Sequence, residues 1–414
     1  MTVTTRVRRV FLATALLVIA SCGGSSPESD TASVVPVPKN AVQVSAQRRH
    51  ACVLTANGEV ECWGLNAYGR LGDGTELNRS APSKVAFPDG VRIASLSQGL
   101  SAHTCAIDTD GAVWCWGVNT QGQLGTFDLS RTTVPVKTRG LEGVATAVVT
   151  AEHATCALLG SAGEVWCWGD NTNAVLGQDT DLIVGVNLPG SVVPLQVPRL
   201  SQVERLFAGG NHLCALQRDL QLLCWGDNKY GQLGIGLEEQ TVEPSAVLLL
   251  RGRVADVALG QSHSCVLLSN GAVHCWGANQ HDQLGFQQTL VPGEVPFVTR
   301  LTAPVAVPGR AVALSAGRYF SCATLDDGTV WCWGKVRSAE DDPYAVVTND
   351  DRSTPRQVEG ATGAVGVDGG SRHLCWTVAG GGVRCAGKDD DGQVGNGPGE
   401  VNELVALPVV GYEG

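Results

Sequence analysis

Fourteen of the fifteen cysteines recur in pairs, and paired cysteines can either bind a metal ion or form a disulfide. In six pairs nine residues separate the two thiols, and in the third pair ten residues do. Structural zinc sites commonly use close ligands, with about two to four residues between them. The spacing therefore favours seven disulfides and no metal site, with the pairs Cys52–Cys62, Cys105–Cys115, Cys156–Cys167, Cys214–Cys224, Cys265–Cys275, Cys322–Cys332 and Cys375–Cys385.

Histidine is the second residue type that could do chemistry. Six of the eight histidines recur close to a first cysteine: His50, His103, His153, His212, His263 and His373. His-x-Cys places both side chains on one face of a strand, so His212, Cys214 and Cys224 could converge on a metal. A catalytic set is expected to break a repeat, however, whereas these residues follow it. We predict that they hydrogen-bond strand to strand, with no catalytic residue and no cofactor.

The cysteine spacing also specifies the register of a β-hairpin. If Cys52 lies opposite Cys62, the residues left for the loop are Ala56-Asn57-Gly58. Such a three-residue loop favours a left-handed last residue, which Gly adopts most readily. Directly opposed strand residues lie ~4.5–5.5 Å apart at Cα, within reach of a disulfide. In the fourth repeat Leu220 holds the Gly position, so we expect a different turn there.

The elements that position these residues recur every 51–58 residues, each unit reading as short strands with Gly-rich turns. No stretch of the chain after the N-terminal segment shows sustained helical amphipathicity, which favours an all-β fold. Seven such units predict one closed ring, since propellers have roughly 4–8 blades of four strands. We predict a seven-bladed β-propeller over residues 41–414. Leu404–Val410 is expected to close it by pairing with Val42–Ser45.

Cysteine and tryptophan alternate on the predicted strands. Cys115 and Trp116, for example, must face opposite sides of a strand. We expect one side to hold the disulfides and the other to pack apolar rings between blades.

Each repeat reads as Gly-x-x-His-x-Cys-Ala-Leu, a turn, then Val-x-Cys-Trp-Gly-x-Asn-x-x-Gly-Gln-Leu-Gly, most clearly at 209–216 and 224–234. This pattern resembles the regulator-of-chromosome-condensation repeat family, whose repeats form a seven-bladed propeller. The sixth repeat departs from it, with Phe320 in place of His and no Asn-x-x-Gly-Gln-Leu-Gly after Gly334; the last has Ala386 in place of Trp. The resemblance implies a rigid recognition scaffold. Nucleotide-exchange-factor-like activity is implied by family analogy only.

The N-terminal segment has the features of an export signal. Residues 1–21 carry three Arg followed by the apolar run Val10–Ala20, which is too short to span a bilayer. Ile19-Ala20-Ser21-Cys22 resembles a bacterial lipobox, which implies lipidation of Cys22 with palmitate-type acyl chains. Residues 22–40 then read as a flexible tether. Gly23, after the lipidated cysteine, resembles the signal that sorts lipoproteins to the outer membrane rather than the inner membrane. Whether the protein faces the periplasm or the cell surface is undecided.

Two export routes fit this segment. Arg8-Arg9 resembles part of a twin-arginine signal, which would carry a folded propeller out of a reducing cytoplasm. Seven disulfides instead favour unfolded export by the general secretory route, with oxidation afterwards. Either route predicts an exported lipoprotein of the cell envelope.

Charge limits the partners. Without residues 1–21 the chain has 26 Lys and Arg against 40 acidic residues, a net charge of −14. Nucleic-acid binding needs clustered Lys and Arg, so no nucleic-acid partner is expected. The acidic run Asp389–Asp391 lacks the alternating Asp spacing of calcium loops and reads as a solvated rim. We expect a monomer that contacts the membrane only through its lipid.

The leading functional hypothesis is a non-enzymatic, protein-binding scaffold propeller with an unknown protein ligand. Its candidate contact surfaces are the longer inserts at 178–200, 286–308 and 335–357, because function concentrates in loops on rigid scaffolds. The alternative is a propeller enzyme, a lyase or hydrolase, using central-channel residues. His274 and His281 lie outside the repeat phase, and His274 with Glu294 is the pair such an enzyme could use. A structural envelope protein without a specific ligand is the third possibility.

Overall fold

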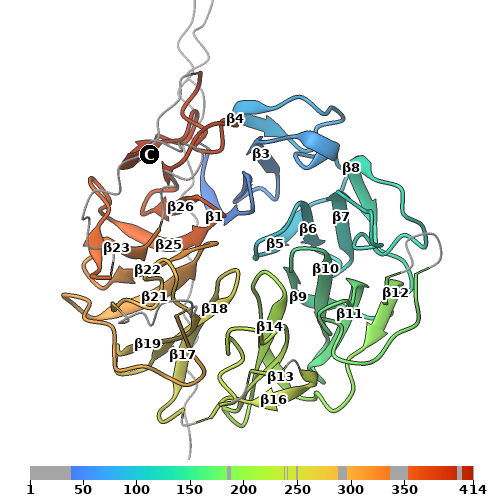
Figure 1. Cartoon of the computed structure of the whole chain (residues 1–414). Coiled ribbons are helices and arrows are strands. Elements are labelled where there is room, and N and C mark those ends of the chain that lie inside the picture. Colours follow the sequence, from blue (N-terminus) through green and yellow to red (C-terminus); the bar gives the residue numbers. More distant parts are fainter. Residues whose placement is uncertain are drawn as a thin grey trace, which may run out of the picture. The chain divides into compact units, whose positions relative to one another are not determined.

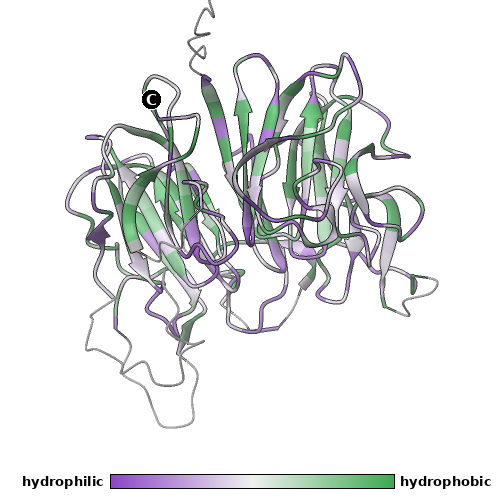
Figure 2. Cartoon of the chain, turned by 90° about the horizontal axis from the view of Figure 1, so that it is seen from above, coloured by the Kyte–Doolittle hydropathy of each residue, from purple (hydrophilic) through white to green (hydrophobic). Residues whose placement is uncertain are grey.

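Seven four-stranded antiparallel sheets, each made from one contiguous repeat, surround a central axis (Figure 1). This confirms the predicted all-β, seven-bladed propeller with one disulfide per blade. Hydrophobic residues concentrate in the strands and hydrophilic residues in many of the connecting loops (Figure 2). The computed structural model describes residues 39–183, 188–236, 238–239, 241–248, 250–287, 296–335, 353–398 and 403–413.

Within each blade the strands follow chain order from the innermost to the outermost. Blades 1 to 4 consist of β1 (Ala41–Ala46), β2 (His50–Thr55), β3 (Val60–Gly64), β4 (Arg79–Lys84); β5 (Ile93–Leu96), β6 (His103–Asp108), β7 (Val113–Gly117), β8 (Thr132–Lys137); β9 (Ala145–Thr150), β10 (Ala154–Leu159), β11 (Glu164–Asp170), β12 (Gly190–Gln196); and β13 (Val203–Ala208), β14 (His212–Gln217), β15 (Leu222–Gly226), β16 (Thr241–Ala246). Blades 5 to 7 consist of β17 (Val254–Leu259), β18 (His263–Leu268), β19 (Val273–Ala278), β20 (Phe297–Val298); β21 (Ala311–Ala316), β22 (Phe320–Leu325), β23 (Val330–Gly334), β24 (Arg356–Gln357); and β25 (Ala364–Gly369), β26 (His373–Val378), β27 (Val383–Gly387), β28 (Glu403–Pro408). One short 3-10 turn, η1 (Ala67–Gly69), follows β3.

The two ends of the ring differ in the connections they carry. At one end, called the hairpin end, lie the loops that join the second and third strands, such as 56–58 in blade 1. At the other, called the loop end, lie the loops that join the third and fourth strands, such as 65–78. First strands start at the hairpin end, where Ile93 N–H donates to the Gly58 carbonyl of the preceding blade (3.0 Å).

The predicted hairpin register is confirmed. Cys52 lies opposite Cys62 and Leu54 opposite Val60, and Gly58 takes φ +79°. All seven cysteine pairs sit opposite each other with Cα atoms 4.0–4.1 Å apart and are joined as disulfides. The spacing of the thiols therefore fixes the hairpin in every blade.

The expectation of a different turn at Leu220 is wrong. Leu220 has φ +72°, and its N–H donates to the Gln217 carbonyl (2.9 Å), the bond that Gly58 makes to Thr55. The flanking strands hold the register, so the turn keeps its form and the leucine adopts the left-handed conformation. That conformation costs an L-residue about 1–2 kcal/mol.

Replacing Leu220 by Gly is expected to stabilise the protein by about 0.5–1 kcal/mol. Gly removes the left-handed strain but adds roughly 0.5–1 kcal/mol of unfolded-state entropy, so the net gain is modest. Denaturant unfolding measures it. Leu220→Ala is the matched control, since it removes the same half-exposed side chain but keeps Cβ. An equal gain from the alanine variant would locate the effect in the side chain and contradict the strain argument.

Neighbouring blades pack through the faces predicted from the Cys-Trp alternation. The disulfide of blade 1, Cys52–Cys62, forms one buried cluster with Trp116 and Ala106 of blade 2. The same arrangement brings the disulfide of each blade against the next blade's tryptophan all around the ring. Each disulfide is therefore part of an interface between blades as well as of its own hairpin.

Blade 7 exchanges the positions of its large and small residues. In blades 1 to 6 the residue after the second cysteine is Trp and the residue after the first is small; in blade 7 these are Ala386 and Trp376. Both face the disulfide of blade 6, so the volume is conserved. The indole N–H of Trp376 has no hydrogen-bond partner, whereas that of Trp116 donates to the Arg70 carbonyl (2.8 Å).

Ring closure does not occur as predicted. β28 pairs with β27 of its own blade, with Leu407 opposite Cys385, so Leu404–Val410 does not pair with Val42–Ser45. The reason is that every repeat supplies all four strands of one blade, so no strand is left over to be shared.

Blades 7 and 1 instead meet through the same contacts as other neighbours. Ala41 N–H donates to the Gly381 carbonyl (3.0 Å), as Ile93 does to Gly58, and Trp63 Nε1–H donates to the Gln393 carbonyl (3.0 Å). Beyond β28, buried Tyr412 adds a hydrogen bond from its hydroxyl to Glu61 of blade 1 (3.0 Å).

Candidate functional site

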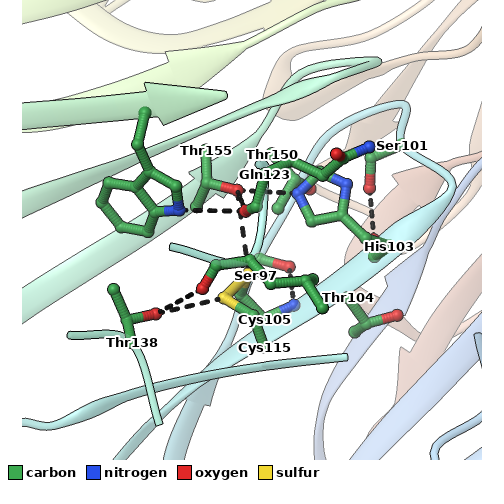
Figure 3. Close-up of a disulfide and its surroundings, with 12 residues drawn as sticks. Ser97, Ser101, His103, Thr104, Cys105, Cys115, Gln123, Thr138, Thr150 and Thr155 are labelled. Atoms are coloured by element: carbon green, nitrogen blue, oxygen red, sulfur yellow. Dashed lines mark hydrogen bonds between the residues drawn. A yellow bond between two sulfur atoms is a disulfide. The ribbon is translucent and has the colours of Figure 1, made fainter. Parts of the chain in front are cut away.

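The recurring histidines connect one blade to the next. Neutral His103 donates from Nε2 to Thr155 Oγ1 of the following blade (2.7 Å), and that hydroxyl donates to the Gln123 carbonyl (2.7 Å) (Figure 3). The same carbonyl accepts the indole N–H of Trp168 (2.9 Å). Three further pairs repeat the histidine–hydroxyl contact at 2.7–2.9 Å: His50–Thr104, His212–Ser264 and His263–Ser321.

Burial keeps these rings neutral. It lowers the pKa of His103, His212 and His263 to about 3 and that of His373 to about 4. His50, His103, His212 and His263 are buried imidazoles paired with hydroxyls and are structural groups, as the repeat pattern predicts. They are positioned to bind blades together and not to exchange protons with a ligand. His373 has no hydroxyl partner among the described residues, because Ala51 takes that position in blade 1.

His153 is an exception to the predicted set. Ala154, opposite Gly169, takes the place that His50 holds opposite Gly64 in blade 1. Two residues separate His153 from Cys156, whereas one residue separates each of the other recurring histidines from its cysteine. The side chain of His153 is therefore displaced by one position along the strand and is only half-buried. The structure therefore does not place His153 with the recurring histidines.

The out-of-phase histidines do not line the channel as an enzyme would require. His274 lies on β19, the third strand of its blade, and donates from Nδ1 to the Thr302 carbonyl (2.9 Å). The His281 ring packs on Tyr319, with centroids 4.5 Å apart. Glu294 lies outside the described residues. Within those residues no group of three His, Cys, Asp or Glu could hold a metal ion.

Gln47 of blade 1 is a buried side chain that connects three blades near the axis of the ring. The buried amide donates from Nε2 to the Ser97 carbonyl (3.1 Å), and Oε1 accepts from Ser101 Oγ (3.0 Å) and Thr150 Oγ1 (3.4 Å). These partners belong to blades 2 and 3, so blades 1 to 3 meet around one side chain. The space that remains is lined mostly by blades 4 to 7, with Gln98, Gly99 and Val149 of the blade 2 and 3 side at its edge.

A polar bridge crosses the channel at the loop end. Glu152 of blade 3 pairs with Arg48 of blade 1 and accepts from Gln261 Nε2 of blade 5 (3.0 Å). Because these blades alternate around the ring, the bridge spans the channel mouth. At the hairpin end Arg205 is 42% exposed, and Val312 and Val365 of neighbouring blades are half or more exposed. We take this second mouth as the one that solvent reaches.

Between the two ends lies a cavity of about 230 Å³. Phe207 and Ala258 contribute apolar wall, and Ser315 and Asp368 contribute polar groups. Arg205 and Asp256 stand beside it as an ion pair (2.6 Å), with Asp256 also accepting the Leu314 N–H (2.9 Å). The sequence analysis did not single out Asp368, Arg205 or Asp256. The signal was present, since Asp368 and the Arg205–Asp256 pair stand at inner-strand positions where most repeats have Ala, Gly, Ser or Val.

The loop end carries a regular structure in most blades. Asn119 Oδ1 accepts the Leu124 N–H (2.9 Å), and the corresponding asparagines of blades 1, 3, 4 and 5 do the same. In blade 7 Asp389 takes this role, accepting the Val394 N–H (2.7 Å). The aspartate that begins the acidic run 389–391 is therefore a loop-forming residue.

A second hydrogen bond latches a loop to the outer strand of the next blade. Gly74 N–H donates to the Thr133 carbonyl (2.9 Å) in this way, and blades 2, 4 and 7 have equivalent bonds from Phe127, Gly236 and Gly397. Within the described residues no such bond occurs in blades 3, 5 and 6, which carry the inserts 178–200, 286–308 and 335–357. Parts of these inserts, 184–187, 288–295 and 336–352, lie outside the described residues.

Seven sheets with this loop pattern and a cavity inside the ring define a seven-bladed propeller of RCC1-like repeats. The family model described as RCC1-like domain matches residues 20–340, and the chain belongs to this family. The family resemblance noted in the sequence is thereby confirmed.

Relatives at the level of sequence include a receptor and a ligase. The chain is 29% identical to the ultraviolet-B receptor UVR8 of Arabidopsis thaliana over 337 residues, which cover 80% of this chain and 71% of UVR8. It is also 29% identical over 274 residues to the human E3 ubiquitin-protein ligase HERC2, covering 63% of this chain but only 6% of HERC2.

Solved structures show the same fold. Prp20p of Saccharomyces cerevisiae, described with its binding properties to Gsp1p and histones, superposes with a TM-score of 0.69 at 23% identity, covering 80% of each chain. Human WBSCR16 superposes with a TM-score of 0.66 at 19% identity, covering 82% of this chain and 86% of the other. At these identities the likeness concerns the fold alone.

Proposed function

We propose that this propeller is a non-enzymatic scaffold that binds a protein partner through its loop end. The observation that carries the proposal is the distribution of the inserts. Each insert includes most of the connection between the third and fourth strands of its blade, and that connection lies at the loop end. Loops that a rigid ring presents at one end are suited to contact another protein.

The relatives support binding in a general way. UVR8 is named as a receptor, and the Prp20p structure is described with protein partners. A ligase activity is not carried over from HERC2, of which the chain spans 6%. Nucleotide exchange on a GTPase has no support beyond a shared fold, so we do not propose it.

Site-specific photo-crosslinking in cells tests the choice of end. Leu182, 59% exposed in the blade 3 insert, and Val312, 50% exposed at the hairpin end, are each replaced by a photoreactive residue. We expect a protein adduct at Leu182 and none at Val312. Replacing 178–189 by residues 126–131 of blade 2, with a photoreactive residue in the new loop, should abolish it. An adduct at Val312 alone, or one that survives the replacement, would contradict the proposal.

We further propose that residues 1–21 are a lipoprotein signal peptide, that 22–40 tether the propeller of 41–414, and that acylated Cys22 anchors it in a bacterial envelope, on an outer-membrane leaflet. Seven disulfides support an oxidising compartment. No helix among the described residues is long and apolar enough to cross a membrane. In this proposal the lipid is the membrane contact.

Metabolic labelling with a palmitate analogue tests the anchor. The full chain is expected to incorporate label and to fractionate with outer membranes, whereas Cys22→Ala should remain unlabelled. A labelled Cys22→Ala variant would rule out this residue as the acceptor. Label in the wild type together with inner-membrane fractionation would contradict only the sorting inferred from Gly23.

A further inference from the structure

Asp368 of β25 is a carboxylate deep inside the ring without a cationic partner among the described residues. Its Oδ2 accepts the Ala46 N–H of blade 1 (2.9 Å), and its Oδ1 accepts the N–H of Gly369 (3.1 Å). Each oxygen keeps a further lone pair, because a carboxylate can accept about four hydrogen bonds. The side chain borders the cavity, so those lone pairs are available to a ligand there.

Ser315 is a second polar group on the cavity wall with spare capacity. It is 5% exposed and occupies the position on β21 that Asp368 occupies on β25. Within the described part of the chain its Oγ has no hydrogen-bond partner. Buried hydroxyls are nearly always hydrogen-bonded, and an unpaired one costs about 1–3 kcal/mol. In the neighbouring blades 1 and 2 the corresponding serine pair is satisfied, since Ser45 Oγ donates to the Ser97 carbonyl (2.6 Å).

We propose that the channel cavity binds a small organic cation, a primary alkylammonium group, with Asp368 and Ser315 as its acceptors and the apolar wall around its alkyl stem. Three N–H donors match one carboxylate and one hydroxyl. Phe207 and Ala258 suit a short aliphatic chain, and about 230 Å³ is smaller than pockets for drug-sized ligands. This site is separate from the loop-end surface proposed above.

Other cations fit less well. A metal ion needs more oxygen ligands than one carboxylate and one hydroxyl provide. A guanidinium would need a free carboxylate edge for bidentate pairing, and both oxygens of Asp368 already accept a backbone N–H. A quaternary ammonium would need an aromatic cage, whereas the wall has one ring, Phe207, and Arg205 covers it (4.8 Å).

The charges around the cavity make binding dependent on pH. Burial raises the pKa of Asp368 to about 7. Ser315 of β21 and the mutually paired Arg205 of β13 and Asp256 of β17 line the same cavity. The polar side chains of adjacent β1, Gln43 and Ser45, are hydrogen-bonded to blade 2. Arg48 and Glu152 pair with each other at the loop end. Only the ionised carboxylate attracts an ammonium, so binding should strengthen as the pH rises through 7 and should release a proton.

Ligand-observed NMR with n-butylamine, at constant ionic strength and with the whole mature protein, tests the site. We expect saturable binding at pH 8 that is about tenfold weaker at pH 6, matching the ionised fraction of a carboxyl with a pKa of about 7. Isosteric 1-butanol should not compete. Absence of saturable butylamine binding by the wild type would overturn the proposal.

Three variants locate the ammonium. Asp368→Asn keeps an oxygen for the Ala46 N–H and should lose at least tenfold in affinity together with the pH dependence, while Ser315→Ala should lose severalfold. Asp327→Asn, an exposed hairpin carboxyl, is the matched control and should bind as the wild type does. Equal binding by wild type and Asp368→Asn would overturn the assignment.

Competition with a lysine-containing peptide identifies the source of the ammonium group. A peptide that competes with butylamine identifies a lysine side chain, and a peptide that does not compete identifies a free amine; both results support the site. If the loop-end crosslinks fail while butylamine binds, this inference stands without the proposed function.

Discussion

Lowering the pH from 7 to 5 is expected to reduce the free energy of unfolding by about 5 kcal/mol or more, since buried His50 adds its own loss to those of the other buried histidines. The pKa of His103, His212 and His263 is about 3 in the folded protein, against ~6.5 for an unfolded histidine. Stability from a depressed pKa is present above ~6.5 and is lost as the pH falls toward 3. At pH 5 each of these histidines, and His373 with its pKa of about 4, has lost about 2 kcal/mol.

Asp368 acts in the opposite direction. Its folded pKa of about 7 lies above that of an unfolded aspartate, so the folded state gains about 2 kcal/mol on acidification from pH 7 to 5. The net loss is therefore smaller than the four histidines alone would give. Urea unfolding at the two pH values measures it.

The chain supplies its own control for this prediction. Blade 6 already carries Phe320 at the histidine position, which shows that a neutral aromatic ring fits there. His103→Phe should therefore still fold, and its loss of stability between pH 7 and pH 5 should be about 2 kcal/mol smaller than that of the wild type. An unchanged pH dependence would show that His103 does not titrate on unfolding.

Reduction of all seven disulfides in the unfolded chain is expected to prevent refolding. Each bridge closes a loop of about eleven residues, worth perhaps ~2–3 kcal/mol in the chain-entropy model. Seven of them sum to about 15–20 kcal/mol, which exceeds the ~5–15 kcal/mol stability of ordinary domains. The bonds also lie within the blade interfaces, where most of their sulfurs are fully buried. Tryptophan fluorescence after dilution from denaturant, with and without reductant, measures the effect.

Thiol counting in the same samples provides the control. The oxidised mature protein should show almost no free thiol in denaturant, before or after treatment with a chelator, because no metal holds the cysteines. Thiols that appear on chelation would favour the metal alternative. Complete refolding of the reduced chain would show that packing alone supports the ring.

The sequence predicts most of the fold because the repeat is local. The Cys52–Cys62 spacing is enough to derive the hairpin, its glycine and the alternation of disulfide and indole faces, since these involve residues about ten positions apart. Leu220 was misjudged because flanking strands overrode its own conformational preference. Ring closure was misjudged because the last segment was expected to pair with blade 1, whereas each repeat uses all four of its strands within one blade.

The candidate cavity could not be predicted in the same way. Asp368 and Ser315 are more than fifty residues apart and meet only because blades 6 and 7 are neighbours around the axis. The repeat pattern shows that both residues differ from their equivalents in other blades. It does not show how close the two side chains lie, because that depends on how the blades are arranged in the closed ring. His274 was singled out only because it lies outside the repeat pattern. It lies on the third strand of its blade, away from the inner strands that line the channel.

The exchange of Trp376 and Ala386 shows where the ring is most weakly joined. The loop whose carbonyl would accept an indole N–H is the segment that blade 6 has lost, and the histidine–hydroxyl pair is replaced by Phe320 and Leu374. The junction between blades 7 and 1, by contrast, keeps the Ala41 and Trp63 bonds although it lacks the histidine–hydroxyl pair, and Lys39 lies over the Tyr412 ring (5.4 Å). The junction between blades 7 and 1 is thus not the weakest in the ring. A circular permutant that joins Glu413 to Lys39 and begins at blade 7 would place its new ends at the weaker junction between blades 6 and 7.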